Sequence, residues 1–81
     1  MEHTLRLSEV DSGATVVLVS MEGGRDFLSR LAALGFIPET RLQVVQNRGR
    51  GPMIVSLRDT RIALGRGESS KILVSLAGEE S

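Results

Sequence analysis

Cysteine, tyrosine and tryptophan are absent from this 81-residue sequence, which contains one histidine and two phenylalanines. Without cysteine, the chain can form neither a disulfide framework nor a thiolate nucleophile, and it cannot supply the Cys/His clusters of structural zinc sites. The single histidine, His3, lies near the N-terminus, where nothing in the sequence holds it beside a serine as a catalytic triad requires. We therefore predict a protein that is not an enzyme and has no metal site.

Long apolar runs are also missing. The run Val16–Val19 is far too short to cross a bilayer, and the N-terminus is acidic and polar where a secretory signal would be basic and then apolar. We predict one cytoplasmic domain over residues 1–81 without direct membrane insertion. Its core should span about residues 4–76, and residues 77–81 should form a flexible tail.

The charges balance overall but are unevenly spread along the chain. Residues 1–40 hold three Arg against six Asp or Glu, whereas residues 41–71 hold seven Arg or Lys against two Asp or Glu. A basic second half is typical of a surface that binds nucleic acid, lipid headgroups or an acidic protein. The alternative is that these arginines lie on solvated edge strands and loops, where they keep the strand edges from pairing with other chains. Its glycine-rich stretches, NRGRGP and LGRGES, lack the spacing of a nucleotide-binding loop, so we predict no cofactor.

Five short runs rich in β-branched residues predict strands. They are TVVLVS, RLQVVQ, PMIVSL, RIAL and KILVSL, and GRGESS is expected to be a short connector or a single helical turn. Short strands with one helix after the first of them predict a mainly β fold. We expect a small SH3-like, partly open β-barrel of about five strands with one inserted α-helix.

One segment, GGRDFLSRLAALG, has helical periodicity. Its large apolar residues recur at i, i+1, i+4 and i+7, which predicts one stripe facing the barrel. These residues are Phe27, Leu28, Leu31 and Leu34. Asp26 is expected in the first turn, where it can pair with Arg30 four residues later.

The stretch LGFIPET predicts a direct joint between helix and strand. Gly35 suits the left-handed conformation that ends a helix, and Phe36 would then pack back on Leu31. Pro38 follows and restricts the backbone on both sides of its peptide bond. Because Glu39 rather than glycine comes next, we predict a type I turn. We expect the joint to press the helix onto the barrel as an extra layer of core.

The strands RLQVVQ and PMIVSL are predicted to pair across NRGRGP. A register that places Val44 opposite Val55 on the inner face also places Val45 beside Ile54 on the outer face. The agreement of side-chain character on both faces supports this register.

The outer face predicts a docking surface. Val45 and Ile54 would form an apolar patch flanked by Arg48 and Arg50, with Arg30 on the helix completing a basic rim, an arrangement typical of protein interfaces. In the alternative interpretation, the N-terminal segment TLRLSEV covers the apolar residues and no docking surface remains.

RNA binding is the alternative function. Small β-barrels bind RNA, and six arginines could contact phosphate: Arg41, Arg48, Arg50, Arg58, Arg61 and Arg66. Recognition of single-stranded bases usually needs aromatic platforms, however, and both phenylalanines are assigned to the core. We therefore expect no nucleic acid partner.

Seven segments also carry a family resemblance. They are TLRLSEV, DSG, VVLVSMEGG, RLAALGFIPET, RLQVV, GPMIVSLRDTRIALGRGES and KILVSL, and they run in order from about Thr4 to Leu76. Their most specific parts are LAALGFIP after an amphipathic helix and the strand pair MIVSLRDTRIALGRGES. Together they resemble the FeoA family, small cytoplasmic companions of the FeoB ferrous-iron transporter.

The resemblance implies an SH3-like barrel and a non-enzymatic, accessory role in ferrous-iron uptake. The expected partner is FeoB, a membrane protein with a cytoplasmic GTPase domain, and docking there would place the chain peripherally at the inner membrane. The chain departs from the family pattern at Glu39, where Pro-Gly is usual, and at DSG, where a Lys-Pro-Gly-like turn is usual. Because a related domain occurs in iron-dependent repressors, the fold alone does not separate transport from regulation.

Overall fold

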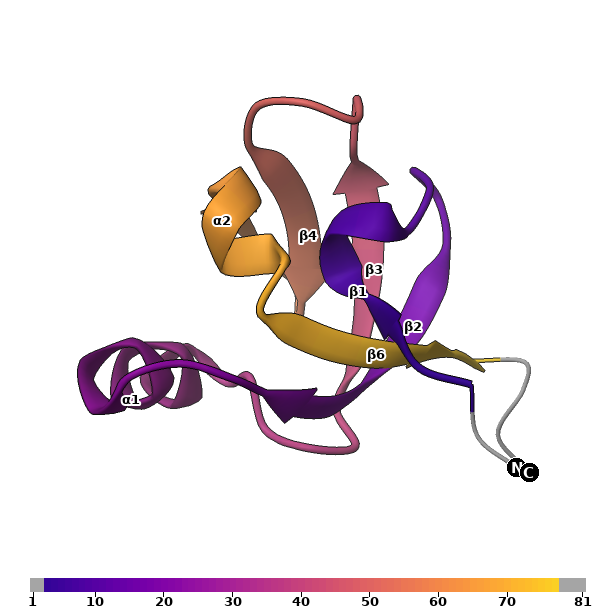
Figure 1. The fold of residues 1–81 in the computed structure, drawn as a ribbon. Helices are drawn as coiled ribbons and strands as arrows, with labels where there is room; N and C mark the ends of the chain where they lie inside the picture. Colours follow the sequence, from indigo (N-terminus) through magenta and orange to yellow (C-terminus); the bar gives the residue numbers. More distant parts are fainter. Residues whose placement is uncertain (1–2, 78–81) are drawn as a thin grey trace.

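The computed structural model describes residues 3–77 as one antiparallel sheet that curls into an open barrel. Its strands are β1 (Leu5–Arg6), β2 (Thr15–Met21), β3 (Arg41–Gln46), β4 (Met53–Leu57), β5 (Thr60–Leu64) and β6 (Ile72–Leu76). Its helices are the 3-10 helix η1 (Leu7–Glu9), α1 (Arg25–Leu34) and α2 (Arg66–Ser69). The strand order is β1-β6-β2-β3-β4-β5. Figure 1 labels β1, β2, β3, β4 and β6 together with α1 and α2.

This architecture confirms the predicted mainly β fold with its inserted helix. The sheet has six strands within residues 3–77 rather than about five, because Leu5–Arg6 pairs with β6. The stretch GRGESS contains the single helical turn α2, as expected. Since β1 and β5 are both edges, the barrel stays open between them.

Alternation along the strands places one continuous apolar core inside the barrel. In β4, for example, every second residue is buried and the residues between are half-buried. The core consists of Leu7, Val10, Val16, Leu18, Leu31, Phe36, Leu42, Val44, Met53, Val55, Leu57, Leu64, Ile72 and Val74. Phe36, the largest fully buried side chain, comes from the joint after α1 rather than from a strand.

The β3–β4 hairpin follows the predicted register only in part. Val44 lies opposite Val55 as predicted, but Ile54 lies opposite Gln46, so the predicted Val45–Ile54 pair is wrong. The reason is a shift in register between Val44 and Gln46, where β3 carries one extra residue. Such a bulge bends and twists a strand, and it does so here just before the chain leaves the sheet.

The end of α1 has the predicted geometry. Gly35 has a φ of +107°, and its N–H donates to the carbonyl of Ala32. The N–H of Phe36 donates to the carbonyl of Leu31 at 3.0 Å, which completes the two-bond motif of a left-handed helix end. A Cβ at Gly35 would lie 3.1 Å from Cδ2 of Leu57, so both backbone and space favour glycine there.

The turn after this joint differs from the prediction. Glu39 has a φ of +78° and the N–H of Thr40 donates to the carbonyl of Ile37, which is the pattern of a type II turn rather than type I. The adjoining strand imposes this conformation, because the N–H of Glu39 donates to the carbonyl of Leu18 at 2.7 Å. The N–H of Leu18 in turn donates to the carbonyl of Thr40 at 2.9 Å.

Helix α1 does not add the expected extra layer to the core. Leu31 is the buried residue of its ten, and Figure 1 shows α1 standing to one side of the barrel, beyond the end of β2. Phe27 packs at the margin of the core, but Leu34 is 49% exposed. Because Leu31 and Phe36 fix the end of the helix, its earlier turns extend past the barrel instead of lying on it.

Candidate protein-docking surfaces

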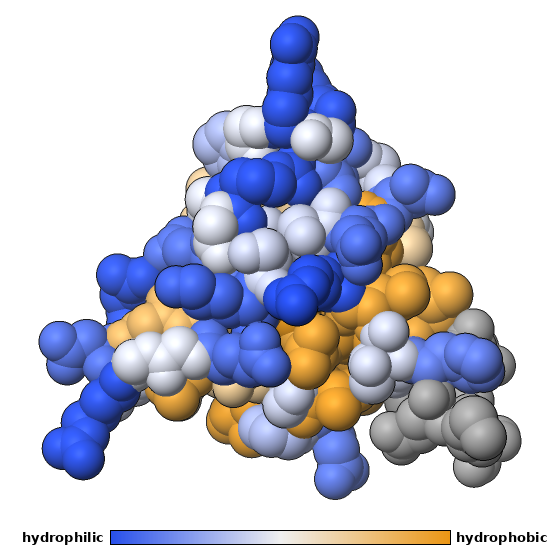
Figure 2. Space-filling view, viewed as in Figure 1, coloured by the Kyte–Doolittle hydropathy of each residue, from blue (hydrophilic) through white to orange (hydrophobic). Residues whose placement is uncertain are grey.

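The loop between β3 and β4, residues 47–52, carries two of the predicted docking residues. Arg48 and Arg50 are exposed, and Figure 2 shows a hydrophilic projection at the top, where Figure 1 places this loop. We call residues 47–52 the basic loop. Val45 and Ile54 lie at the ends of the strands that it joins, and both are half-buried.

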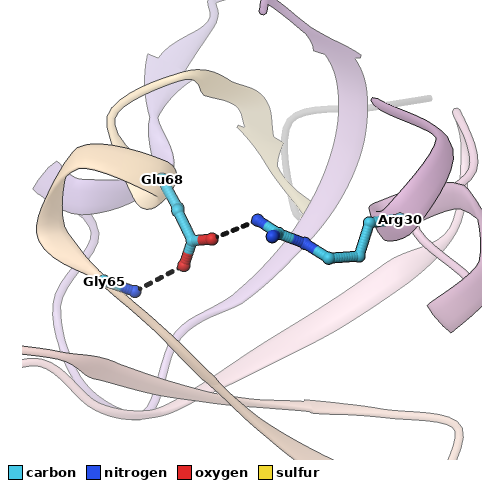
Figure 3. A network of polar contacts seen from close by, with 3 residues as sticks. All are labelled: Arg30, Gly65 and Glu68. Carbon is cyan, nitrogen blue, oxygen red and sulfur yellow. Dashed lines mark hydrogen bonds and ion pairs between the residues drawn. The ribbon is translucent and has the colours of Figure 1, made fainter. Parts of the chain in front are cut away.

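Arg30, the remaining predicted docking residue, is engaged elsewhere. Its Nη2 binds Oε2 of Glu68 on α2, so the predicted pairing with Asp26 is replaced by a link between two helices. Figure 3 shows Arg30 reaching from α1 toward Glu68, whose other carboxylate oxygen accepts the N–H of Gly65 at 2.9 Å. Glu68 thus caps α2 and anchors α1 with one side chain.

Asn47 organises the base of the basic loop. Its Nδ2 donates to the carbonyl oxygens of Ser8 at 3.0 Å and Val10 at 2.7 Å. Its Oδ1 accepts the N–H of Gly49 at 3.0 Å and Nη2 of Arg66 at 2.8 Å. A carboxamide offers two donors and two acceptor lone pairs, so Asn47 uses its full capacity.

Sequence analysis did not identify this role of Asn47. An asparagine two residues before a glycine is a known signal for a local side-chain turn, which accounts for its bond to Gly49. Its other partners are Ser8 in η1, Val10 just after η1 and Arg66 in α2. They lie 39 and 37 residues before Asn47 and 19 residues after it, so no local pattern in the sequence indicates them.

Arg66 is the second member of this network. Its Nη1 donates to the carbonyl of Ser8 at 3.0 Å, and its Nη2 reaches Asn47. Its Nε is buried without a hydrogen-bond partner among residues 3–77. The guanidinium therefore joins α2, η1 and the basic loop, and it is not free to contact phosphate as the RNA hypothesis supposed.

The other arginines of the RNA hypothesis do not gather in one stripe. Arg48 and Arg50 precede β4, whereas Arg58 follows it, in the tight turn that leads into β5. The exposed positive charge is therefore divided between the two ends of β4.

A second exposed feature lies at the end of α1. Leu34 is 49% exposed and Ile37 is 47% exposed, and they are the exposed large hydrophobic residues of the described chain. We call this pair the α1 apolar end. Sequence analysis placed Leu34 on the apolar stripe of the helix. Helical periodicity predicts which face is apolar but not whether another element covers it.

Two further searches covered the same described part of the chain. Residues 3–77 contain no group of three or more His, Asp or Glu side chains placed to hold a metal ion. No helix within these residues has the length and hydropathy needed to span a bilayer.

Residues 5–76 match the family model described as the FeoA domain. The chain belongs to the FeoA domain family. It is 32% identical over 68 residues to a putative Fe(2+) transport protein A of Methanocaldococcus jannaschii, a match that covers 84% of this chain and 82% of that protein. It is also 34% identical over 73 residues to a fusion of Fe(2+) transport protein A and the transporter FeoB from Porphyromonas gingivalis. That match covers 89% of this chain but 9% of the fusion protein.

Solved FeoA structures share the fold. The chain superimposes on a crystal structure of an iron uptake regulatory protein (FeoA) with a TM-score of 0.83 at 29% identity, covering 90% of this chain and 97% of that one. A zinc complex of Stenotrophomonas maltophilia FeoA, described as an SH3 domain protein, gives a TM-score of 0.77 at 27% identity, with coverage of 86% and 88%. The predicted SH3-like fold is thereby confirmed.

The fold also occurs outside free-standing FeoA proteins. A manganese-dependent transcriptional repressor matches with a TM-score of 0.85 at 20% identity, covering 94% of this chain and 43% of that chain. At that identity the likeness concerns the fold alone.

Proposed function

We propose that this FeoA-family chain is a non-enzymatic accessory protein of ferrous-iron uptake that binds a FeoB-type transporter on its cytoplasmic side. The observation that carries the proposal is the relative in which Fe(2+) transport protein A and FeoB form one polypeptide. A covalent fusion holds two units at a high effective concentration, which is advantageous when they act in contact. A chain that is not fused to FeoB would then need a binding surface that holds it on the transporter.

The α1 apolar end is suited to be the anchor of such a surface. Leu34 and Ile37 are separated by the Gly35–Phe36 joint, whose backbone is fixed by hydrogen bonds, so little conformational entropy is lost when they are covered. Fully burying a Leu or Ile side chain contributes roughly 1.5–3 kcal/mol. Two half-exposed side chains therefore supply part of an interface rather than all of it.

The docking surface predicted from the sequence would supply a polar part. Arg48 and Arg50 project into solvent beside the half-buried Val45 and Ile54. The α1 apolar end precedes β3 and the basic loop follows it, so under this proposal a partner that contacts both extends along this strand (Figure 1).

Binding to detergent-solubilised FeoB from the same source tests the function directly. Biolayer interferometry would compare the wild-type chain with Leu34→Gln, Ile37→Gln and, as a matched control on an exposed helical position, Ala32→Gln. We expect saturable binding that the first two substitutions weaken and the control preserves. Repeating the measurement with and without guanine nucleotide would show whether binding follows the nucleotide cycle of the transporter.

A pool of RNA run in parallel addresses the alternative function. Salt-sensitive binding to RNA without any binding to FeoB would contradict the proposal and favour the RNA hypothesis, because phosphate contacts weaken steeply with salt. Binding to FeoB at moderate salt with only a weak RNA signal would support the accessory role.

A further inference from the structure

Three arginines make contacts that join separate segments of the fold. Nη1 of Arg6 donates to the carbonyl of Ser70 at 2.6 Å, Arg30 binds Glu68, and Arg66 binds Ser8 and Asn47. Each of these guanidiniums joins two separate segments of the chain. At least one donor of each is therefore used by a contact within the fold.

Arg48 and Arg50 differ from this group. Both side chains are exposed, and neither has a hydrogen-bond or ion-pair partner within residues 3–77. The basic loop has the sequence NRGRGP, so it contains no acidic residue that could neutralise them. The two arginines thus lie two residues apart on one short loop that contains no carboxylate of its own.

The loop that carries them is tied down rather than free. Asn47 closes its base with four side-chain hydrogen bonds, and the backbone N–H of Asn47 donates to Oγ of Ser12 at 2.7 Å. Gly49 and Gly51, which alternate with the arginines, have φ values of +81° and +71°. A constrained loop loses less entropy on binding than a flexible one, so its charges bind more effectively.

We propose that the basic loop binds an acidic peptide segment, with Arg48 and Arg50 each pairing with a carboxylate. Asn47 and Arg66 are positioning residues that hold the loop without touching the ligand. Guanidinium suits this task because its planar fork matches carboxylate geometry and forms charge-assisted hydrogen bonds. The inference rests on the proposed function for the identity of the partner, since it places the acidic segment on the cytoplasmic part of the transporter.

The surroundings of the loop favour a peptide over a membrane or a nucleic acid. Glu9 and Asp11, both exposed, alternate with Ser8 and Val10, the residues whose carbonyls bind Asn47. Their carboxylates lie on the segment attached to the loop and would repel a broad anionic surface. A peptide can place single carboxylates against the two arginines and avoid this repulsion.

A titration that does not need the transporter tests the loop by itself. Amide chemical shifts of ¹⁵N-labelled full chain would be followed while a short synthetic Asp/Glu-rich peptide is added at low ionic strength, with the Asn/Gln version of the peptide as control. We expect shifts centred on Gly49, Arg50 and Gly51 with the acidic peptide alone. The double variant Arg48→Ala, Arg50→Ala should lose them.

The matched control removes two exposed arginines from the other end of β4. Arg58→Ala with Arg61→Ala changes the net charge by the same amount and should leave the loop shifts in place. Equal loss in both double variants would overturn the inference, because it would mean that net charge rather than the loop attracts the peptide. Vesicles of phosphatidylcholine and phosphatidylglycerol provide a further arm, and tighter, loop-dependent binding to them than to the peptide would also overturn it.

A second measurement tests the positioning role of Asn47. In Asn47→Ala we expect lower heteronuclear NOE values at Gly49 and Gly51 and a several-fold weaker affinity for the acidic peptide, while the salt dependence of binding stays unchanged because both arginines remain. Ser12→Ala, which loses only the contact to the backbone of Asn47, should change these values less. Unchanged NOE values and affinity in a folded Asn47→Ala chain would refute the positioning role.

The transporter experiment separates the two proposals. Against FeoB, the Arg48→Ala, Arg50→Ala chain should bind roughly tenfold or more weakly than wild type, with a shallower salt dependence. Unchanged binding would overturn the loop inference and leave the accessory function standing. Peptide binding at the loop without any binding to FeoB would support the loop inference and contradict the accessory function.

Discussion

The barrel and helix α1 both contain apolar segments but are stabilised in different ways. The inward side chains of β2, β3, β4 and β6 are almost completely buried, so each strand supports its neighbours. Helix α1 contributes Leu31 to that core, and its other attachments are Phe27 at the margin and the ion pair of Arg30. The difference indicates that the barrel holds the helix in place and that the end of the helix leaves apolar surface exposed.

Truncation of side chains on either side of Gly35 should test this comparison most strongly. Phe36→Ala removes the largest fully buried side chain and should lower the free energy of unfolding by about 3–5 kcal/mol, through lost burial and a cavity. Leu34→Ala, two residues earlier and half-exposed, should change it by only about 0.5 kcal/mol. Urea unfolding followed by circular dichroism measures both. A cost above about 2 kcal/mol for Leu34→Ala would mean that α1 packs on the barrel after all.

Removal of the Asn47 side chain should have the next largest effect. Asn47→Ala leaves the carbonyl of Val10 and Nη2 of Arg66 without this partner, while the carbonyl of Ser8 keeps only its bond from Nη1 of Arg66. Unsatisfied polar groups cost about 1–3 kcal/mol. Thermal and urea unfolding would measure the loss. An effect below about 0.5 kcal/mol would show that water replaces these contacts and that the loop needs no internal support.

Glycine substitutions at left-handed residues should stabilise the protein slightly. Asp59 has a φ of +67° in the two-residue β4–β5 turn, and Glu39 has a φ of +78° in the joint after α1. Asp59→Gly and Glu39→Gly should each raise the free energy of unfolding by about 0.5–1 kcal/mol, because relief of left-handed strain exceeds the added entropy of the unfolded chain. Thr60→Gly, whose φ is not positive, is the control and should destabilise. A loss of stability in Asp59→Gly would show that the turn is not strained.

The ion pair between the two helices should matter least. The side chain of Arg30 is 61% exposed and that of Glu68 is 37% exposed, so solvent screens their attraction. Arg30→Ala should cost about 0.2–1 kcal/mol at low salt, and the cost should shrink in high salt. Arg25→Ala on the first turn of the same helix is the control. A salt-independent cost well above this range would mean that the stem of Arg30, and not its charge, anchors α1.

Local signals predicted most of the fold. Runs of β-branched residues located β2 to β6, and the pair Gly35–Phe36 located the end of α1 together with its hydrogen bonds. These features depend on side-chain preferences and spacing over a few residues, so they can be recognised in a single sequence. The two-residue strand β1 exists because β6 offers it a hydrogen-bonding edge, and a pattern of two residues carries no signal of its own.

The errors occurred where distant segments meet. Glu39 adopts a left-handed conformation because Leu18 of β2 binds its N–H, which overrides the local preference that predicted a type I turn. The bulge at Val45 shifts Ile54 against Gln46, and Arg30 leaves Asp26 for Glu68, 38 residues away. Arg48 and Arg50, which the sequence analysis placed beside the outer face, are exposed, and their proposed docking role stays a prediction. The bond between Asn47 and Arg66 at the base of their loop joins residues far apart in sequence.

The sequence by itself determined the apolar alternation, the helix end and the family resemblance. Each of these features depends on the types and spacing of residues that are close together in the sequence. Tertiary structure alone decided which apolar face stays uncovered and which arginines stay free. Leu34 and Leu31 lie on the same predicted stripe, and only the position of the barrel buries one and exposes the other. The exposure of a side chain depends on which other elements pack against it, and those elements come from residues far apart in sequence.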